Sequence, residues 1–251
     1  MDEQRRTHLD LFSGIGGFAL AAKWAGFDTV AFCECEPYAK RVLRKNFPAI
    51  PIIDDIHELD GRDFRGCRLV SGGFPCQPFS HAGVRRGEAD HRSLWREMAR
   101  VVSQCQPTWI LAENVAGLAT MGLDDVLADL EGMGYEMQTF SVGAVSVGAR
   151  HHRPRLWIVG RVRDVSDSDG GRREEQRQPE PIQSNEQRQA AILEPERGSR
   201  ATRRQPESWG WQTEPDFRRV AHGIPSRVDR LRGLGNAICP AVAYEFLRLM
   251  T

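Results

Sequence analysis

The sequence predicts an α/β fold with a doubly wound, mostly parallel β-sheet of the Rossmann-like type. Between residues 7 and 160, short runs of β-branched and aromatic residues alternate with longer stretches of helical periodicity. This alternation is typical of βαβ units, in which a crossover helix joins two parallel strands. A glycine-rich segment at 14–17 stands between the first strand and the first helix, where folds of this type bind a ligand.

The strands are expected where short apolar runs are bounded by turn-forming residues. In chain order these runs lie at 8–12, 29–34, 69–73, 109–114, 136–142 and 155–160. Helical periodicity between them predicts helices at 18–26, 37–46, 93–104 and 123–133. Near the C-terminus, Gly235-Asn236 predicts a turn, and Pro240 predicts the first turn of a last helix.

The composition changes after Gly160 and divides the chain into three parts. Residues 163–205 contain no Phe, Trp or Tyr and are rich in Arg, Glu, Gln, Pro and Ser. Such a segment buries too little apolar surface to form a core of its own. We therefore expect a domain at 1–160, a short and partly disordered region at 161–222, and a segment at 223–251 that returns to the domain.

Charge and apolar content exclude several classes of protein. The 34 basic and 34 acidic residues balance, which argues against a uniformly basic nucleic-acid binder but allows a local basic face. No apolar run reaches the roughly 18 residues of a membrane span, and the N-terminus lacks the apolar segment of a secretion signal. The six cysteines show neither a CxxC pair nor zinc-ligand spacing. We expect a cytoplasmic protein with reduced thiols, no metal and no membrane contact.

The segment DLFSGIGGFALAA at 10–22 has the features of a turn that binds an adenosine-containing cofactor. Gly14, Gly16 and Ala19 fit the pattern GxGxxA, and Glu34 ends the next strand about twenty residues after Gly14. A carboxylate there can accept hydrogen bonds from ribose hydroxyls, both in a nicotinamide dehydrogenase and in an S-adenosylmethionine enzyme. Asp55 follows a third strand end, where it would bind an adenine amino group or cap the next helix.

The segment SGGFPCQPFS at 71–80 places Cys76 directly after a strand, where open α/β sheets have their ligand crevice. Pro75 and Pro78 restrict the backbone on both sides of the thiol. A long polar loop follows, from Gln77 to Arg92. This arrangement suits a nucleophile beneath a mobile loop better than a core cysteine.

Two further clusters of polar residues belong to other strands. Glu113 and Asn114 end the strand WILAEN, and Arg153 and Arg155 stand before and at the start of RLWIVG. A thiol, a carboxylic acid and an arginine around one crevice suit a planar heterocycle that is attacked at carbon while its ring nitrogen is hydrogen-bonded. These residues alone do not name the heterocycle.

In order and spacing, several segments resemble the DNA (cytosine-5) methyltransferases, particularly the small phage- and prophage-type members. The segments are DLFSGIGGFALA, CECEPYAKRVLRKNFP, GGFPCQPFS, RSLWREMARVV, ENV, RHHRPRLWIVG and RLRGLGNAICPAVA. They cover about residues 8–160 and 223–246. The resemblance implies the fold of an S-adenosylmethionine-dependent methyltransferase, in which 1–160 is catalytic and 161–222 is a reduced target-recognition region.

The resemblance also implies how the catalytic residues act. Cys76 would add to C6 of a cytosine, so that C5 can accept the methyl group of S-adenosylmethionine, leaving S-adenosylhomocysteine. Glu113 would bind the ring at N3 and Arg155 would hold the carbonyl, while Arg153 supports the site. Because C6 and N3 are inaccessible inside a duplex, the base must be flipped out.

For the cofactor, the resemblance implies a ribose contact by Glu34, an adenine contact by Asp55, and further contacts by Phe12, Ser13, Gly14, Gly16, Gly17, Leu94 and Asn236. Residues for closing over double-stranded DNA would be Gln77, Ser80, Arg85 and Arg86. The chain would act as a monomer in a prokaryotic or phage-infected cell, and a cognate restriction enzyme would be a natural companion.

The sequence departs from the family's pattern in three places, one of which is the usual penultimate motif, reduced here to GIPSRVDRLRGLG at 223–235. His151 stands where glutamine is usual, and the recognition interval is only about 60 residues long. The short interval predicts relaxed or partner-dependent sequence specificity. The rival interpretations are an RNA cytosine-5 methyltransferase, a catalytically silent DNA-binding module of the same fold, and a dehydrogenase, which would leave Cys76 and Glu113 unexplained.

Overall fold

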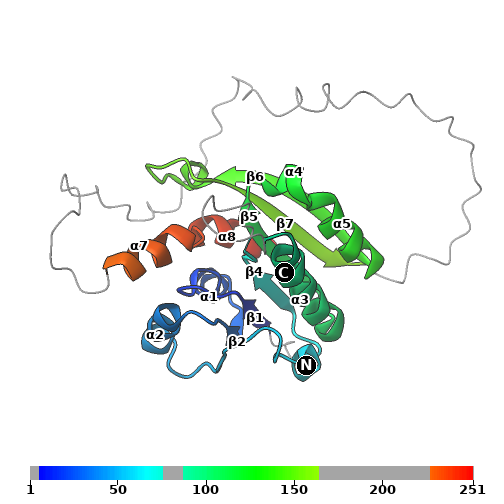
Figure 1. The fold of residues 1–251 in the computed structure, drawn as a ribbon, viewed down its shortest axis with the longest axis horizontal. Coiled ribbons are helices and arrows are strands. Elements are labelled where there is room, and N and C mark those ends of the chain that lie inside the picture. The colour runs from blue at the N-terminus through cyan, green and yellow to red at the C-terminus, as the bar shows by residue number, and fades with distance from the viewer. Residues whose placement is uncertain (1–5, 76–86, 164–226, 251) are drawn as a thin grey trace, which may run out of the picture. The chain divides into compact units, whose positions relative to one another are not determined.

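The computed structural model describes residues 6–75, 87–163 and 227–250, which contain a seven-stranded sheet of order β3-β2-β1-β4-β5-β7-β6 (Figure 1). β1 to β5 are parallel, and β7 runs antiparallel between β5 and β6. The predicted α/β fold with a mostly parallel sheet is therefore confirmed. The strands are β1 (Thr7–Leu11), β2 (Asp28–Cys33), β3 (Ile52–Ile53), β4 (Leu69–Gly72), β5 (Trp109–Val115), β6 (Tyr135–Gly143) and β7 (Pro154–Val162).

Helices cover both faces of this sheet. The described helices are α1 (Gly17–Trp24), α2 (Pro37–Asn46), α3 (Gly87–Cys105), α4 (Leu118–Met121), α5 (Leu123–Gly132), α7 (Arg227–Asn236) and α8 (Pro240–Leu247), with 3-10 turns η1 (Gly61–Phe64) and η2 (Ala144–Val147). None of these helices has the length and apolarity needed to cross a membrane.

The core divides into two main layers because side chains of a strand alternate between the faces of the sheet. On one face, Ile110 and Ile158 pack with the buried residues of α3 and α5. On the other face, Leu111 and Trp157 pack with α1 and α8, so the C-terminal helix contributes to the core of the sheet. Whether the domain boundaries at 160 and 222 are right stays a prediction, since nearly all of 161–222 lies outside the described residues.

Two predicted boundaries are wrong. The polar loop was expected to extend to Arg92, but α3 already begins at Gly87. The turn expected at Gly235-Asn236 instead forms the end of α7, which the sequence analysis did not predict. In both places the sequence is polar or rich in glycine and arginine, so the helix has no clear apolar stripe to signal it.

Candidate functional site

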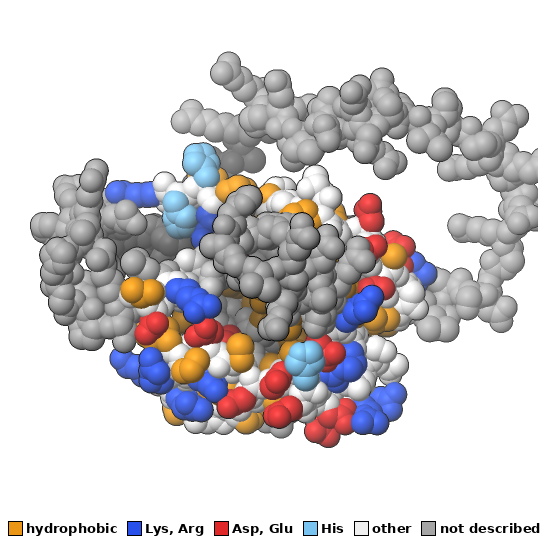
Figure 2. Space-filling view, in the orientation of Figure 1, with side chains coloured by type: hydrophobic (Ala, Val, Ile, Leu, Met, Phe, Trp, Pro, Cys, Tyr) orange, Lys and Arg blue, Asp and Glu red, His pale blue; other side chains and the backbone are white. Residues whose placement is uncertain are grey.

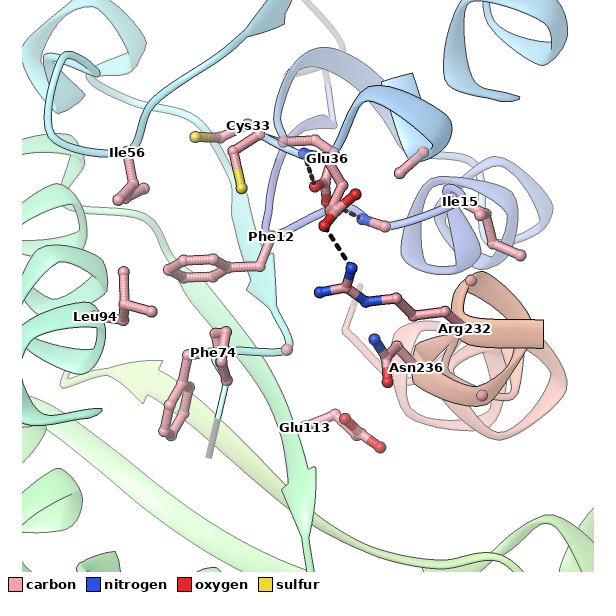
Figure 3. A pocket seen from close by; sticks show the side chains of 18 of the residues that line it. Phe12, Ile15, Cys33, Glu36, Ile56, Phe74, Leu94, Glu113, Arg232 and Asn236 are labelled. Atoms are coloured by element: carbon pink, nitrogen blue, oxygen red, sulfur yellow. Dashed lines mark hydrogen bonds and ion pairs between the residues drawn. The ribbon is translucent and has the colours of Figure 1, made fainter. Parts of the chain in front are cut away.

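A cavity of about 480 Å³ lies where the carboxyl ends of β1, β2, β4 and β5 meet (Figure 3). Its volume is within the range of small-molecule sites, and its place is that expected for a ligand in an open parallel sheet. The sequence-predicted residues that line it are Phe12, Gly14, Glu34, Asp55, Leu94, Glu113, Asn114, Arg153, Arg155 and Asn236. Residues far apart in the sequence are thus brought together around one space.

Glu34 connects the glycine loop to the end of β2. Its carboxylate accepts hydrogen bonds from the amides of Gly14 and Glu36, both at 2.7 Å. Gly14 has φ +54°, a left-handed conformation that glycine adopts at little cost. The side chain is largely buried, yet it lines the cavity, and carboxylate oxygens retain lone pairs for further donors. Glu34 can therefore hold the loop and accept hydrogen bonds from a ligand at once.

Three residues expected in the cofactor loop do not line the cavity, although they fix its wall. The Ser13 hydroxyl donates to a backbone carbonyl of β1 at 2.6 Å. A Cβ on Gly16 would lie 2.8 Å from the Phe47 ring, and a Cβ on Gly17 would lie 2.7 Å from the Ile238 side chain. These two glycines allow the close packing of α1, and their predicted contact with the cofactor stays a prediction.

The opposite wall of the cavity is apolar. Phe12, Ile56 and Leu94 line this side of the cavity, and Phe12 points toward Ile56 and Leu94, as Figure 3 shows. Asp55 lies beside them and accepts a hydrogen bond from the His57 amide at 2.9 Å. This carboxylate therefore caps the turn that follows β3. It also lines the cavity, so its position is compatible with both roles expected from the sequence, as a cap and as a contact for adenine.

Glu113 and Arg155, which both line the cavity, form an ion pair. Arg155 Nε lies 2.9 Å from Glu113 Oε1, and only 8% of Glu113 is exposed. Burial raises the pKa of the Glu113 carboxyl to about 7, because the charged form loses its hydration, while Arg155 and then Arg153 oppose the rise. A carboxyl with such a pKa can donate or accept a proton near neutral pH.

Asn114 fixes the segment that leads to the predicted nucleophile. Its Nδ2 donates to the Phe74 carbonyl at 3.0 Å, and its Oδ1 accepts from the Val115 amide at 2.8 Å. The side chain is 4% exposed, and its bond to the Phe74 carbonyl is buried and protected from water. The sequence placed Asn114 beside Glu113 but did not reveal this role.

α7 forms a wall of the cavity that sequence reasoning missed. It contributes Arg232, whose Nη1 lies 3.0 Å from Glu36 Oε1, and Asn236, which faces the same space (Figure 3). Arg153 reaches the end of α7 and donates to the carbonyls of Gly235 and Ala237. The sequence predicted Asn236 as a residue of the cofactor site and it lines the cavity, but no pattern in the sequence signalled Arg232 or the partners of Arg153.

Some predicted residues are not tested by these observations. Cys76, Gln77, Ser80, Arg85 and Arg86 lie outside the described residues. His151 is exposed and is not part of the cavity lining. Within the described ranges, no group of three or more His, Cys, Asp or Glu residues could hold a metal ion. In the view of Figure 2, acidic and basic side chains are interspersed over the described surface.

Comparison with known proteins relates the chain to enzymes that modify DNA. A model of the C-5 cytosine-specific DNA methylase family matches residues 7–217. Type II methyltransferase M.PspPI of Psychrobacter sp. is 40% identical over 167 residues, which are 63% of this chain and 40% of that protein. Type II methyltransferase M2.BsuMI of Bacillus subtilis is 39% identical over 163 residues, covering 60% of this chain and 41% of that protein.

A solved structure supports the same relationship. The crystal structure of a mutant Spodoptera frugiperda DNMT2 is 26% identical, with a TM-score of 0.55, and the match covers 68% of this chain and 54% of that chain. The chain spans about 40% of the length of M.PspPI and M2.BsuMI. The finer prediction of a phage or prophage type stays a prediction. Because the family model matches most of the sequence, this chain belongs to the C-5 cytosine-specific DNA methylase family.

Proposed function

We propose that the chain transfers a methyl group from S-adenosylmethionine to C5 of a cytosine flipped out of double-stranded DNA. Family membership supports the reaction and the substrate class. The observation that carries the proposal is the buried Glu113–Arg155 pair, which opens into the same cavity as the Glu34 loop. One part of the cavity can thus hold an adenosine-containing cofactor while another binds a heterocycle.

The cavity residues fit S-adenosylmethionine, which would supply an electrophilic sulfonium methyl group. The apolar wall of Phe12, Ile56 and Leu94 suits the faces of an adenine ring. The Glu34 carboxylate, held by two backbone amides, is placed to accept hydrogen bonds from ribose hydroxyls. Asp55 would accept a hydrogen bond from the adenine amino group.

Glu113 and Arg155 would bind the polar edge of cytosine. When the thiolate adds to C6, electron density grows at N3 and at the carbonyl oxygen. A protonated Glu113 donates to N3, and the Arg155 guanidinium donates to the carbonyl oxygen. The pKa of about 7 keeps an appreciable fraction of Glu113 protonated near neutral pH, whereas an ordinary glutamate would be almost fully ionised.

Cys76 would act as the nucleophile. Its sulfur forms a bond to C6, and the electron pair of the C5–C6 double bond moves to C5, which takes the methyl group. A base then removes the C5 proton, the double bond re-forms, and the thiolate of Cys76 leaves. The Asn114–Phe74 hydrogen bond supports this role because it fixes the backbone two residues before Cys76.

Trapping the covalent bond tests this proposal directly. A DNA duplex in which every cytosine carries fluorine at C5 allows addition and methylation but not the final elimination, because fluorine cannot leave as a cation. With S-adenosylmethionine, we expect a denaturation-resistant protein–DNA complex that Cys76→Ser abolishes, and peptide mapping should find the adduct at Cys76. A complex formed only with the matching fluorinated RNA would identify RNA as the substrate. No complex from folded, cofactor-binding protein would contradict the mechanism.

The relatives' description as Type II methyltransferases suggests a biological setting. We propose that the chain acts on DNA in the cytoplasm as a monomer, with a restriction enzyme of the same specificity as its natural companion. A one-base reaction needs only one catalytic cavity, so a dimer is not required by the chemistry.

A further inference from the structure

Arg153 lines the cavity, and its side chain is hydrogen-bonded to the backbone at the end of α7. Its Nη2 donates to the Gly235 carbonyl at 2.6 Å and to the Ala237 carbonyl at 2.7 Å. Gly235 belongs to the last turn of α7, whose carbonyls have no partners within the helix. A guanidinium there also lies at the negative end of the helix dipole. Arg153 is therefore a side-chain cap of α7.

The backbone at Arg153 is held in a conformation that it would not adopt freely. Its φ is +37°, in the left-handed region that non-glycine residues rarely enter, at a cost of about 1–3 kcal/mol. The neighbouring backbone is packed closely, since a Cβ on Gly143 would overlap the His152 carbonyl. The surrounding contacts must offset this strain, and they include the two hydrogen bonds from Arg153 to the Gly235 and Ala237 carbonyls.

The other attachment of α7 is weaker. Arg232 and Glu36 form an ion pair whose side chains are 63% and 45% exposed. Exposed pairs of this kind contribute only about 0–1 kcal/mol. Arg153 makes two hydrogen bonds from one guanidinium, of which the bond to Ala237 is partly buried and the bond to Gly235 is exposed. Together they are the main polar attachment among the described residues between the catalytic edge of the sheet and the end of α7.

We infer that Arg153 is a positioning residue that holds the end of α7, and with it Asn236, against the cofactor part of the cavity. Asn236 stands between the two carbonyls that Arg153 binds, so losing the bonds would release this side chain from the cavity. Both hydrogens of Nη2 are already donated to the backbone. Nε and Nη1 carry three further N–H groups, so the inferred action through α7 is separated from a contact with the base by the tests below. Only the cofactor part of the inference rests on the proposed function.

Arg153 also has an electrostatic effect that can be separated from its hydrogen bonds. Its charge helps Arg155 lower the pKa of Glu113, against the larger effect of burial. Arg155, Glu113 and Cys239 are the titratable groups that act on Arg153 itself. Lysine keeps the positive charge, but its amino group is one bond closer to the backbone than Nη2 of arginine. Arg153→Lys should therefore retain the charge effect and lose much of the cap, whereas Arg153→Ala loses both.

Hydrogen exchange without any ligand tests the cap. The reporter is the amide of Ala237, which donates to the Gly233 carbonyl at 3.1 Å, together with its neighbours at 233–239. We expect about tenfold faster exchange in Arg153→Ala, a smaller increase in Arg153→Lys, and no change in Arg150→Ala, which removes an exposed arginine from the same loop. Unchanged exchange in both Arg153 variants would overturn the inference, whatever reaction the protein performs.

Ligand binding and the pH profile then separate positioning from base contact. We expect Arg153→Ala to bind S-adenosylhomocysteine at least tenfold more weakly in calorimetry, and saturating S-adenosylmethionine to restore most of the single-turnover rate. The alkaline limb of the rate profile should move to higher pH in Arg153→Ala and stay in place in Arg153→Lys. Unchanged affinity with a large loss of rate at saturation would show that Arg153 contacts the base, contradicting the inference. If wild-type protein binds no S-adenosylhomocysteine, the proposed function fails, while the exchange result still stands.

Discussion

Glu113 is the single residue whose protonation bears most directly on the proposed reaction. Replacing Glu113 with glutamine keeps the size of the side chain and places an amide near N3. The amide cannot transfer a proton to N3 when electron density grows there. We expect Glu113→Gln to slow single-turnover methyl transfer by about 100-fold or more with little loss of stability. Glu131→Gln, an exposed carboxyl on α5, is the matched control. Normal transfer by the Glu113 variant would show that N3 is not its target.

The pH dependence tests the same carboxyl without removing it. The pKa of Glu113 is raised from 4.5 to about 7, so the protonated form is retained below about pH 7 and lost above it. If that form is the N3 donor, kcat/KM should fall with rising pH along a limb near pH 7. The limb should be absent from Glu113→Gln. A profile that is the same in both proteins would assign the titration to another group.

Single residues differed in how far the sequence could predict them. Glu113 and Arg155 were recognised because their types and spacing match a motif, and the structure brings them to 2.9 Å. The bonds of Asn114 and Arg153 were not recognised, because their partners are backbone carbonyls and, for Asn114, also a backbone amide. Any residue supplies such a carbonyl, so only the folded path of the chain shows where they lie.

At the scale of elements, the strands were predicted well because a parallel sheet covered on both faces needs apolar runs. The strands predicted at 29–34 and 155–160 correspond to β2 (Asp28–Cys33) and β7 (Pro154–Val162). α7 was missed because glycine and arginine dominate its sequence and its place depends on contacts with α2 and Arg153. Elements defined by tertiary contact leave little trace in local periodicity.

The start of α1 offers a prediction about packing. Gly16 has φ +88°, and an added Cβ would meet Phe47 at 2.8 Å and Leu43 at 3.0 Å. Backbone strain and overlap together should make Gly16→Ala less stable by about 1–3 kcal/mol in urea unfolding. Gly132→Ala at the end of α5 is the control, since a Cβ there meets nothing within 4 Å and its φ is not in the left-handed region. Equal stability of the two variants would show that the 14–17 turn does not require glycine at this position.

For the whole molecule, the recognition of DNA is expected to depend on the sequence after Gly160. Residues 163–205 lack aromatic side chains, so deleting 165–205 should leave the affinity for S-adenosylhomocysteine within about twofold. The same deletion should weaken duplex binding, measured by fluorescence anisotropy at a fixed salt concentration. A deletion variant that cannot fold would show that this segment supports the core.

We propose above all that this chain methylates cytosine in DNA by means of Cys76. The most direct test is base-resolution sequencing of 5-methylcytosine in DNA from a methylation-deficient host that expresses the chain, beside a Cys76→Ser control. We predict methylation that disappears in the control, at cytosines whose flanking bases are only loosely defined, because the recognition interval is short. Methylation confined to one sharply defined motif would contradict the prediction of loose sequence specificity, but not the assignment of the reaction to Cys76. No methylation from folded wild-type protein, or equal methylation by Cys76→Ser, would contradict the claim itself.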